Sequence, residues 1–196
     1  MNQSHPEKCE FEAWPTELVF EAPSLVVLSG PSGVGKSTFA KRLFEREAYI
    51  VSTDAIREEL RGDVNNVSNR EEILDEAAFR AALHFELRDT PAVIDFTGQT
   101  PDDRQRFTEV AGIYGVPAYL VVLDAHPQVL EKGRNLQGRQ YDPEGLEESF
   151  RMMLINQEAT KKMVGRGEYR SEGFVTATIL PIERAQLIQK VQFAAE

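Results

Sequence analysis

Residues 25–37 read Leu25-Val26-Val27-Leu28-Ser29-Gly30-Pro31-Ser32-Gly33-Val34-Gly35-Lys36-Ser37, and they determine the fold class of this 196-residue chain. The first five residues are apolar enough to form a buried strand. The next eight match the pattern G-x-x-x-x-G-K-[ST], in which glycines let backbone N–H groups curl around an anion. Residues 38–46 have the pattern of a helix, whose positive end then points at the same anion. This order of strand, loop and helix predicts a nucleotide-binding site.

Two side chains of this loop have expected roles of their own. Lys36 would reach the β- and γ-phosphates of a nucleotide, and the hydroxyl of Ser37 would bind Mg²⁺. A glycine-rich stretch can also be an ordinary turn, but here the spacing, the Lys-Ser pair and the preceding strand all favour a phosphate site. The expected nucleotide-binding residues are Gly30, Pro31, Ser32, Gly33, Val34, Gly35, Lys36, Ser37 and Thr38.

Length and composition indicate one globular domain. Apolar residues make up 41% of the chain and charged residues 28%, and no apolar run approaches the length of a membrane span. The net charge of −10 argues against a surface that wraps nucleic acid but permits a local basic groove. Cys9 is the single cysteine and no secretion signal is recognisable, so we expect a cytoplasmic protein without a membrane partner. Residues 1–20 are expected to form a leader with one short candidate strand, and residues 21–196 the domain.

Apolar runs alternate with amphipathic stretches along the domain, which is the pattern of α/β proteins. We expect a five-stranded parallel sheet between helices, with strands near residues 25–29, 48–52, 91–96, 118–124 and 174–179.

Helix starts are also marked in the sequence. Thr100 and Asp142 each precede a proline and an acidic residue, which is the composition of a helix N-terminus. A long helix is expected over residues 68–87, with Phe79 and Phe85 on the face that enters the core rather than on a base-stacking platform.

The second expected strand runs into Ser52-Thr53-Asp54-Ala55-Ile56-Arg57. Ligands of open α/β sheets bind at the carboxyl ends of the strands, so Asp54 should lie beside the phosphate loop. An acid and an arginine there suit a site for an acceptor: Asp54 would take the proton of an attacking hydroxyl, and Arg57 would grip an anionic group. The alternative role of Asp54 is to cap the following helix.

These motifs resemble the 5′-hydroxyl polynucleotide kinases of the P-loop type, over residues 25–174. In that family a Ser-Ser/Thr-Asp-x-x-Arg segment follows the phosphate loop, matched here by residues 52–57. The resemblance implies ATP as phosphate donor, Asp54 as general base and Arg57 as a contact to the acceptor's 3′-phosphate. The implied acceptors are 5′-hydroxyl ends of DNA or RNA, with any ligase or phosphatase partner on a separate chain.

The third motif, Val93-Ile94-Asp95-Phe96-Thr97-Gly98, departs from the family's Val-Val-Asp-Ala-Thr-Asn at Phe96 and Gly98. Asp95 would orient a Mg²⁺-bound water or a lid arginine, or else make a structural hydrogen bond. Arg104 also resembles a recurrent family position and is a candidate substrate contact, although an arginine in the first turn of a helix is often simply solvated.

A lid is expected at Arg134-Asn135-Leu136-Gln137-Gly138-Arg139. In the family, lid arginines bind the ATP phosphates and neutralise charge during transfer, which maps to Arg134 and Arg139. Gly133 and Gly138 would ease movement of the lid. The alternative is an exposed loop whose charges are solvated.

Other functions remain open at this point. Kinases of small metabolites, antibiotics or sugar nucleotides share a phosphate loop, an acid after the second strand and a lid, and an acidic surface suits a small acceptor. A nucleotide-dependent regulatory switch is a further alternative, although it gives Asp54 and Arg57 no obvious purpose. The basic residues between Lys161 and Arg170 either complete the nucleotide site or lie on a solvated surface.

Overall fold

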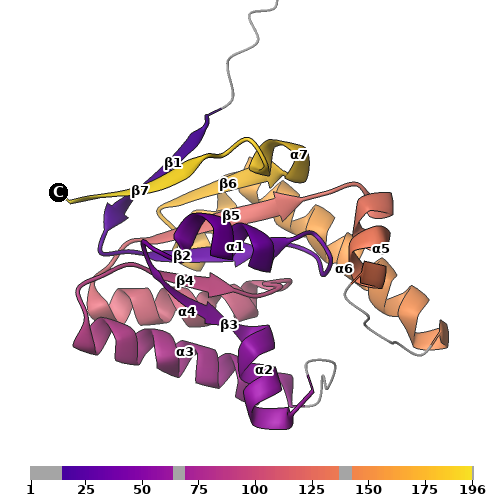
Figure 1. Ribbon diagram of the computed structural model, residues 1–196, viewed down its shortest axis with the longest axis horizontal. Coiled ribbons are helices and arrows are strands. Elements are labelled where there is room, and N and C mark those ends of the chain that lie inside the picture. Colours follow the sequence, from indigo (N-terminus) through magenta and orange to yellow (C-terminus); the bar gives the residue numbers. More distant parts are fainter. Residues whose placement is uncertain (1–14, 64–68, 137–142, 196) are drawn as a thin grey trace, which may run out of the picture.

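A computed structural model describes residues 15–63, 69–136 and 143–195. Its centre is a five-stranded parallel sheet of order β3-β4-β2-β5-β6 (Figure 1). The strands are β2 (Leu25–Ser29), β3 (Tyr49–Ser52), β4 (Ala92–Asp95), β5 (Ala118–Asp124) and β6 (Thr176–Pro181). The strand before the phosphate loop, β2, is buried along its whole length and pairs with β4 and β5. The predicted α/β class and all five strands are confirmed.

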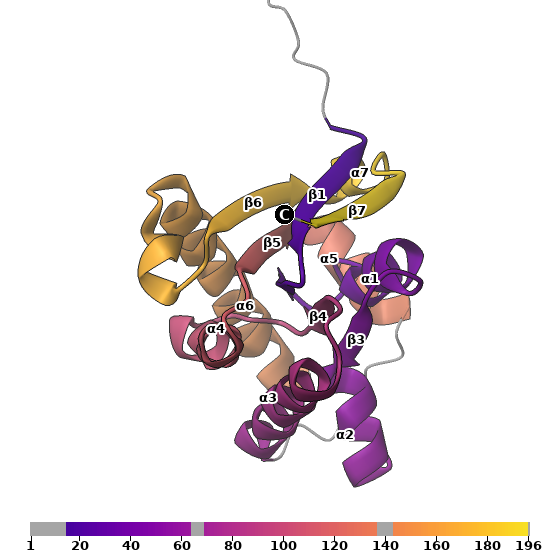
Figure 2. The same ribbon diagram turned by 90° about the vertical axis from the view of Figure 1, so that its left-hand side faces the viewer.

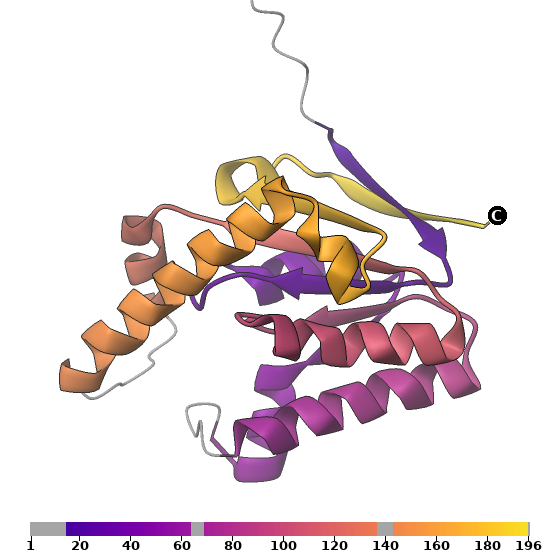
Figure 3. The ribbon, with the colours of Figure 1, turned by 180° about the vertical axis from the view of Figure 1, so that it is seen from behind.

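Helices cover both faces of this sheet, and each face has its own apolar core (Figure 2). Helix α1 packs on one face, and α3 and α4 pack on the other. Figure 3 shows α6 crossing the back of the molecule from the side of α5 toward β6. The helical elements are α1 (Lys36–Phe44), α2 (Thr53–Arg61), α3 (Arg70–Leu87), α4 (Pro101–Tyr114), α5 (Pro127–Leu136), α6 (Pro143–Gly165), the 3₁₀ helix η1 (Glu168–Glu172) and α7 (Ile182–Ala185).

A second, two-stranded sheet joins the two ends of the described chain. Strand β1 (Glu17–Ala22) contains the short strand expected before residue 21. It pairs in parallel with β7 (Lys190–Ala195), and neither β7 nor this pairing is predicted from the sequence. Phe20 of β1 is 7% exposed and packs against Tyr119 and Phe193, with ring centroids 5.1 and 5.6 Å away. Residues 17–20 therefore pack with the folded domain, ahead of the boundary expected at residue 21.

The helix starts follow the sequence closely. Thr100 caps α4 with a reciprocal capping box, in which its hydroxyl accepts from the amide of Asp103 and the Asp103 carboxylate accepts from the amide of Thr100. Helix α6 begins at Pro143, while Asp142 lies outside the described residues.

The core face of α3 differs from the expectation. Its buried residues are Ile73, Leu74, Ala77 and Ala81, and Phe79 is 60% exposed on the opposite side of the helix. Phe85 is half-buried and packs against the apolar core, as expected. Over the part of the chain that is described, no helix is both long and apolar enough to cross a membrane.

Candidate active site

The phosphate loop holds its lysine close. Gly35 caps α1 in a left-handed conformation, and Lys36, the first residue of α1, is only 8% exposed. The Lys36 ammonium donates to the carbonyl oxygens of Gly30 and Pro31, both at 2.9 Å. The charge is therefore fixed against the loop itself, where the β- and γ-phosphates of a nucleotide are expected.

Asp95 is the buried acid of the site. It ends β4, next to the phosphate-loop strand β2, and is 5% exposed. Burial raises the pKa of its carboxyl group, while the charge of Lys36 and a hydrogen bond from Ser37 act in the opposite direction. Ser52 donates a further hydrogen bond to Asp95 Oδ2 at 3.4 Å.

This arrangement fits Mg²⁺. The ion prefers a few oxygen ligands beside substrate phosphates and water. Ser37 and Asp95 supply a hydroxyl and a carboxylate that already contact each other at the phosphate loop. No group of three or more His, Cys, Asp or Glu side chains suited to a metal is found within the described ranges, so a metal here would rely on the nucleotide for its other ligands.

The second acid, Asp54, comes from the start of α2. The cap of α2 is Ser52, whose side chain accepts from the amide of Ala55 at 3.5 Å, so Asp54 is not the cap. Arg57, one turn further, donates to Asp54 Oδ1 at 2.5 Å. The side chain of Asp54 stays 38% exposed, whereas that of Arg57 is 14% exposed. The arginine therefore orients the carboxylate while leaving it accessible.

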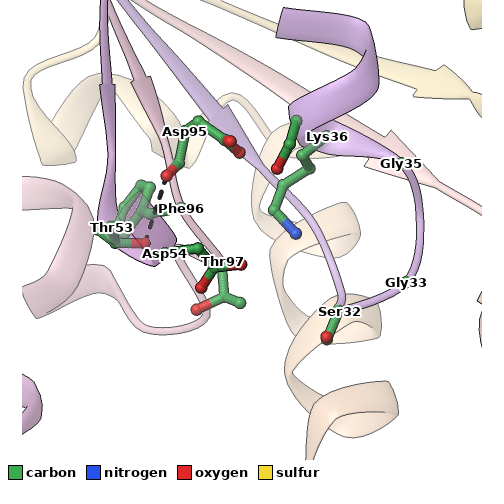
Figure 4. Close-up of a pocket in the computed structure, with 10 residues that line it drawn as sticks. Ser32, Gly33, Gly35, Lys36, Thr53, Asp54, Asp95, Phe96 and Thr97 are labelled. Carbon is green, nitrogen blue, oxygen red and sulfur yellow. Dashed lines mark hydrogen bonds between the residues drawn. The ribbon is translucent and has the colours of Figure 1, made fainter. Parts of the chain in front are cut away.

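One pocket joins these parts (Figure 4). Asp54, Asp95 and Thr97 lie on one side of it, and Lys36 and the phosphate loop lie on the other. The lining residues are Ser32, Gly33, Gly35, Lys36, Ser37, Thr53, Asp54, Asp95, Phe96 and Thr97. The carboxyl ends of β2, β3 and β4 thus bring together the phosphate loop, the motif of residues 52–57 and the motif of residues 93–98.

Other predicted residues lie differently. Thr38 is exposed in the first turn of α1 and does not line the pocket. Arg134 belongs to α5, but its side chain is not among those described, and Arg139 lies outside the described residues. The structure does not bring Arg104 to the pocket: it is 1% exposed and forms an ion pair with Glu172 at 2.7 Å. The expected contact of Arg104 with a substrate is therefore replaced by a contact inside the protein, the ion pair with Glu172.

Helix α5 meets the phosphate loop directly. A Cβ atom built on Gly133 would lie 2.1 Å from the carbonyl oxygen of Gly33. Only glycine allows the two backbones to approach this closely. The helix that leads into the predicted lid is therefore anchored on the loop that is expected to hold the phosphates, and Gly133 serves this close contact rather than the expected flexibility.

Both departures from the family pattern have a structural basis. The ring of Phe96 is 2% exposed and packs edge-on against Phe107, with centroids 4.8 Å apart. Gly98 has a φ of +54°, and a Cβ atom there would lie 2.9 Å from the Phe96 ring and from the Ser29 hydroxyl, so there is no room for a side chain. Thr97, which lies between Phe96 and Gly98 in the sequence and for which the sequence suggests no role, lines the pocket.

Comparison with known proteins agrees with this architecture. The family model of the AAA domain family AAA_33 matches residues 25–159, which is more than half of the chain. The chain belongs to the AAA_33 family. The matched range of this AAA_33 domain begins at β2 and includes the phosphate loop, both acids and all residues of the expected lid. No curated protein matches the sequence.

Solved structures share the fold of the AAA_33 domain at low sequence identity. A gluconokinase from Sinorhizobium meliloti 1021 is 19% identical over 86% of this chain and 91% of that chain, with a TM-score of 0.56. A structure of the PezAT chromosomal toxin–antitoxin system of Streptococcus pneumoniae is 15% identical over 88% of this chain and 78% of that chain, with a TM-score of 0.58. The chain therefore has the fold of a P-loop kinase.

Proposed function

We propose that this protein is an ATP-dependent phosphotransferase that acts on a hydroxyl group. The observation that carries the proposal is the shared pocket, in which the phosphate loop and Lys36 face Asp54 and Asp95. A switch that only hydrolyses nucleotide would not need an accessible, arginine-oriented carboxylate opposite its phosphate loop.

The chemistry follows from these positions. Asp54 accepts the proton of the acceptor hydroxyl, whose oxygen forms a bond to the γ-phosphorus. The bond from that phosphorus to the bridging oxygen breaks, and ADP leaves with the charge. In this proposal Lys36, held at the phosphate loop, stabilises that charge, and the transfer depends mainly on such positioning. A Mg²⁺ ion held at Ser37 and Asp95 would supply further charge neutralisation.

For the acceptor we propose a 5′-hydroxyl end of DNA or RNA. The support is the resemblance of residues 52–57 to the polynucleotide kinases, together with an arginine in the expected lid. In this assignment Arg57 reaches both Asp54 and the acceptor's neighbouring phosphate.

A small hydroxylated metabolite is the second candidate, favoured by the charge around α2 and α3. Three arginines that follow the phosphate loop in the chain are paired with carboxylates: Arg57 with Asp54, Arg61 with Glu72 and Arg70 with Asp103. Together with the net charge of −10, this leaves less positive charge for a long polyanion.

The test is an acceptor panel with γ-labelled ATP and Mg²⁺. The acceptors are 5′-hydroxyl DNA and RNA oligonucleotides, their 5′-phosphorylated counterparts as matched controls, and a set of sugars, sugar acids and nucleosides. Label on 5′-hydroxyl oligonucleotides alone supports the first assignment. Label only on a small molecule would replace it with the second, and absence of transfer to every acceptor would count against the kinase proposal.

A further inference from the structure

The loop that follows β4, residues 96–99, is tied to the phosphate loop. The amide of Gly30 donates to the carbonyl oxygen of Thr97 at 3.1 Å. The hydroxyl of Ser29 donates to the carbonyl oxygens of Thr97 and Gly98 at 3.2 and 3.1 Å. Because Phe96 and Thr97 line the pocket, the position of this loop sets part of the surface that faces an acceptor.

A buried ion pair holds the same loop from behind. Arg104 Nη1 donates to the carbonyl oxygen of Gly98 at 2.7 Å. Arg104 Nε and Nη2 donate to the two carboxylate oxygens of Glu172, each at 2.7 Å, and Nη1 also reaches Thr160 Oγ1 at 3.3 Å. Arg104 and Glu172 are 1% and 5% exposed. The guanidinium therefore connects η1, α6 and the loop inside the protein.

Close packing around Gly98 leaves residues 96–99 little room to move relative to Arg104. A Cβ atom built on Gly98 would lie 2.9 Å from the ring of Phe96 and 2.9 Å from the hydroxyl oxygen of Ser29. On the far side, the Asn156 side chain of α6 donates to Gln99 Oε1 at 3.4 Å. A displacement of the Gly98 carbonyl would therefore be transmitted to its neighbour Thr97.

We propose that Arg104 is a positioning residue for the pocket, which acts through the Gly98 carbonyl to fix Thr97, and that Glu172 fixes Arg104. This inference rests on the proposed function for its effect on catalysis, but not for its effect on the loop. A buried ion pair of this kind adds little net stability over an apolar pair of similar volume, because both charges lose their hydration. Its distinctive contribution here is the directed hydrogen bond to the loop.

The test compares three variants. Arg104→Met/Glu172→Leu removes both charges, so no unpaired buried charge remains. Arg104→Lys keeps the positive charge beside Glu172. A single ammonium group does not have the planar fork of the guanidinium, so it cannot donate to the Gly98 carbonyl and to both carboxylate oxygens of Glu172 together. Arg106→Met is the matched control, because Arg106 lies on the same helix and pairs with Glu71 and Asp75 at the surface.

The first readout is independent of activity. Hydrogen exchange of the Gly30 amide reports its bond to Thr97, and the Val27 amide in the middle of β2 serves as internal reference. We expect the Gly30 amide to exchange about two- to tenfold faster in the double variant, as for loss of one hydrogen bond. The exchange rate of the Val27 amide should be unchanged in the double variant. In Arg106→Met both amides should exchange at the wild-type rate.

The second readout is transfer to the acceptor identified by the panel. Displacement of the loop should lower kcat by about a hundredfold, with the dissociation constant of the nucleotide nearly constant. A double variant that folds with unchanged Gly30 exchange and unchanged kcat would overturn the proposal. If the double variant does not fold, Arg104→Lys carries the test, and unchanged exchange and kcat in that variant overturn it equally. If the wild-type protein transfers phosphate to nothing, the proposed function fails and the exchange experiment still decides this inference.

Discussion

Ser52 and Asp95 are register partners at the carboxyl ends of β3 and β4, and the hydroxyl of Ser52 donates to the Asp95 carboxylate at 3.4 Å. The same side chain caps α2 by accepting from the amide of Ala55. One serine thus joins the buried acid Asp95 to the helix that carries Asp54. The relative position of the two acids on this side of the pocket is therefore set by the edge of the sheet, which is a rigid element.

Asp95 should reduce stability in exchange for function. Its folded-state pKa is raised above 3.8, chiefly by burial, so the folded chain binds more protons than the unfolded chain between the two pKa values. Stability then falls as pH rises through that window and stays lower above it. We expect Asp95→Asn to raise the free energy of unfolding at pH 7 and to weaken nucleotide binding in Mg²⁺.

Urea unfolding at pH 7 and well below pH 3.8 checks this prediction, with the exposed Asp89→Asn as control. The stabilisation should shrink at the lower pH, where the Asp95 carboxyl is protonated in both states. Loss of stability at pH 7 in Asp95→Asn would contradict the role assigned to this carboxylate.

Lys36 should contribute to donor binding as well as to the conformation of the phosphate loop. Replacement by methionine removes two hydrogen bonds to the loop and the charge that would face the phosphates. Loss of a charged hydrogen bond costs about 1.5–3 kcal/mol, or roughly ten- to a hundredfold in the dissociation constant. Calorimetric titration of Lys36→Met with a non-hydrolysable ATP analogue measures this effect. An unchanged dissociation constant would show that phosphates bind elsewhere.

Gly133 should tolerate no side chain. The Cβ of Gly133→Ala would meet the carbonyl oxygen of Gly33, so α5 or the phosphate loop must shift, at a cost of about 1–3 kcal/mol of stability. Nucleotide binding should weaken with it. Gly112→Ala is the control: Gly112 lies in α4, and a Cβ atom there would meet nothing within 4 Å, so alanine should stabilise by about 0.5–1 kcal/mol. Thermal unfolding with and without nucleotide compares Gly133→Ala with Gly112→Ala. Equal melting temperatures and equal stabilisation by nucleotide in the two variants would refute the contact between Gly133 and Gly33.

Phe96 should be a packing residue, although the resembled family has alanine at this position. Phe96→Ala removes the ring that packs on Phe107 and should cost about 3–5 kcal/mol of stability. Chemical unfolding of the variant measures this cost. A loss below about 1 kcal/mol would mean that the ring serves the pocket instead of the core.

Local patterns predicted the elements around the site. The apolar run of β2, the glycine-rich loop and the Thr100 cap each act within a few residues, so their sequence signals suffice. The rule that ligands bind at the carboxyl ends of parallel strands then brought Asp54 and Asp95 together correctly.

Contacts between distant residues could not be predicted in this way. The partner of Arg104 is Glu172, 68 residues away, and no local feature distinguishes a buried arginine from a solvated one. The pairing of β1 with β7 joins opposite ends of the chain, and the exposed Phe79 shows that an aromatic residue in a helix need not lie on its core face.

The proposed phosphotransferase depends above all on Asp54 as its general base. Single-turnover transfer of labelled γ-phosphate probes this role in Asp54→Asn, beside Glu58→Gln, an exposed acid on the same helix. We expect Asp54→Asn to slow transfer by about 10²–10⁴-fold with nucleotide affinity retained, and Glu58→Gln to behave as wild type. Transfer by Asp54→Asn at the wild-type rate would show that Asp54 is not the base.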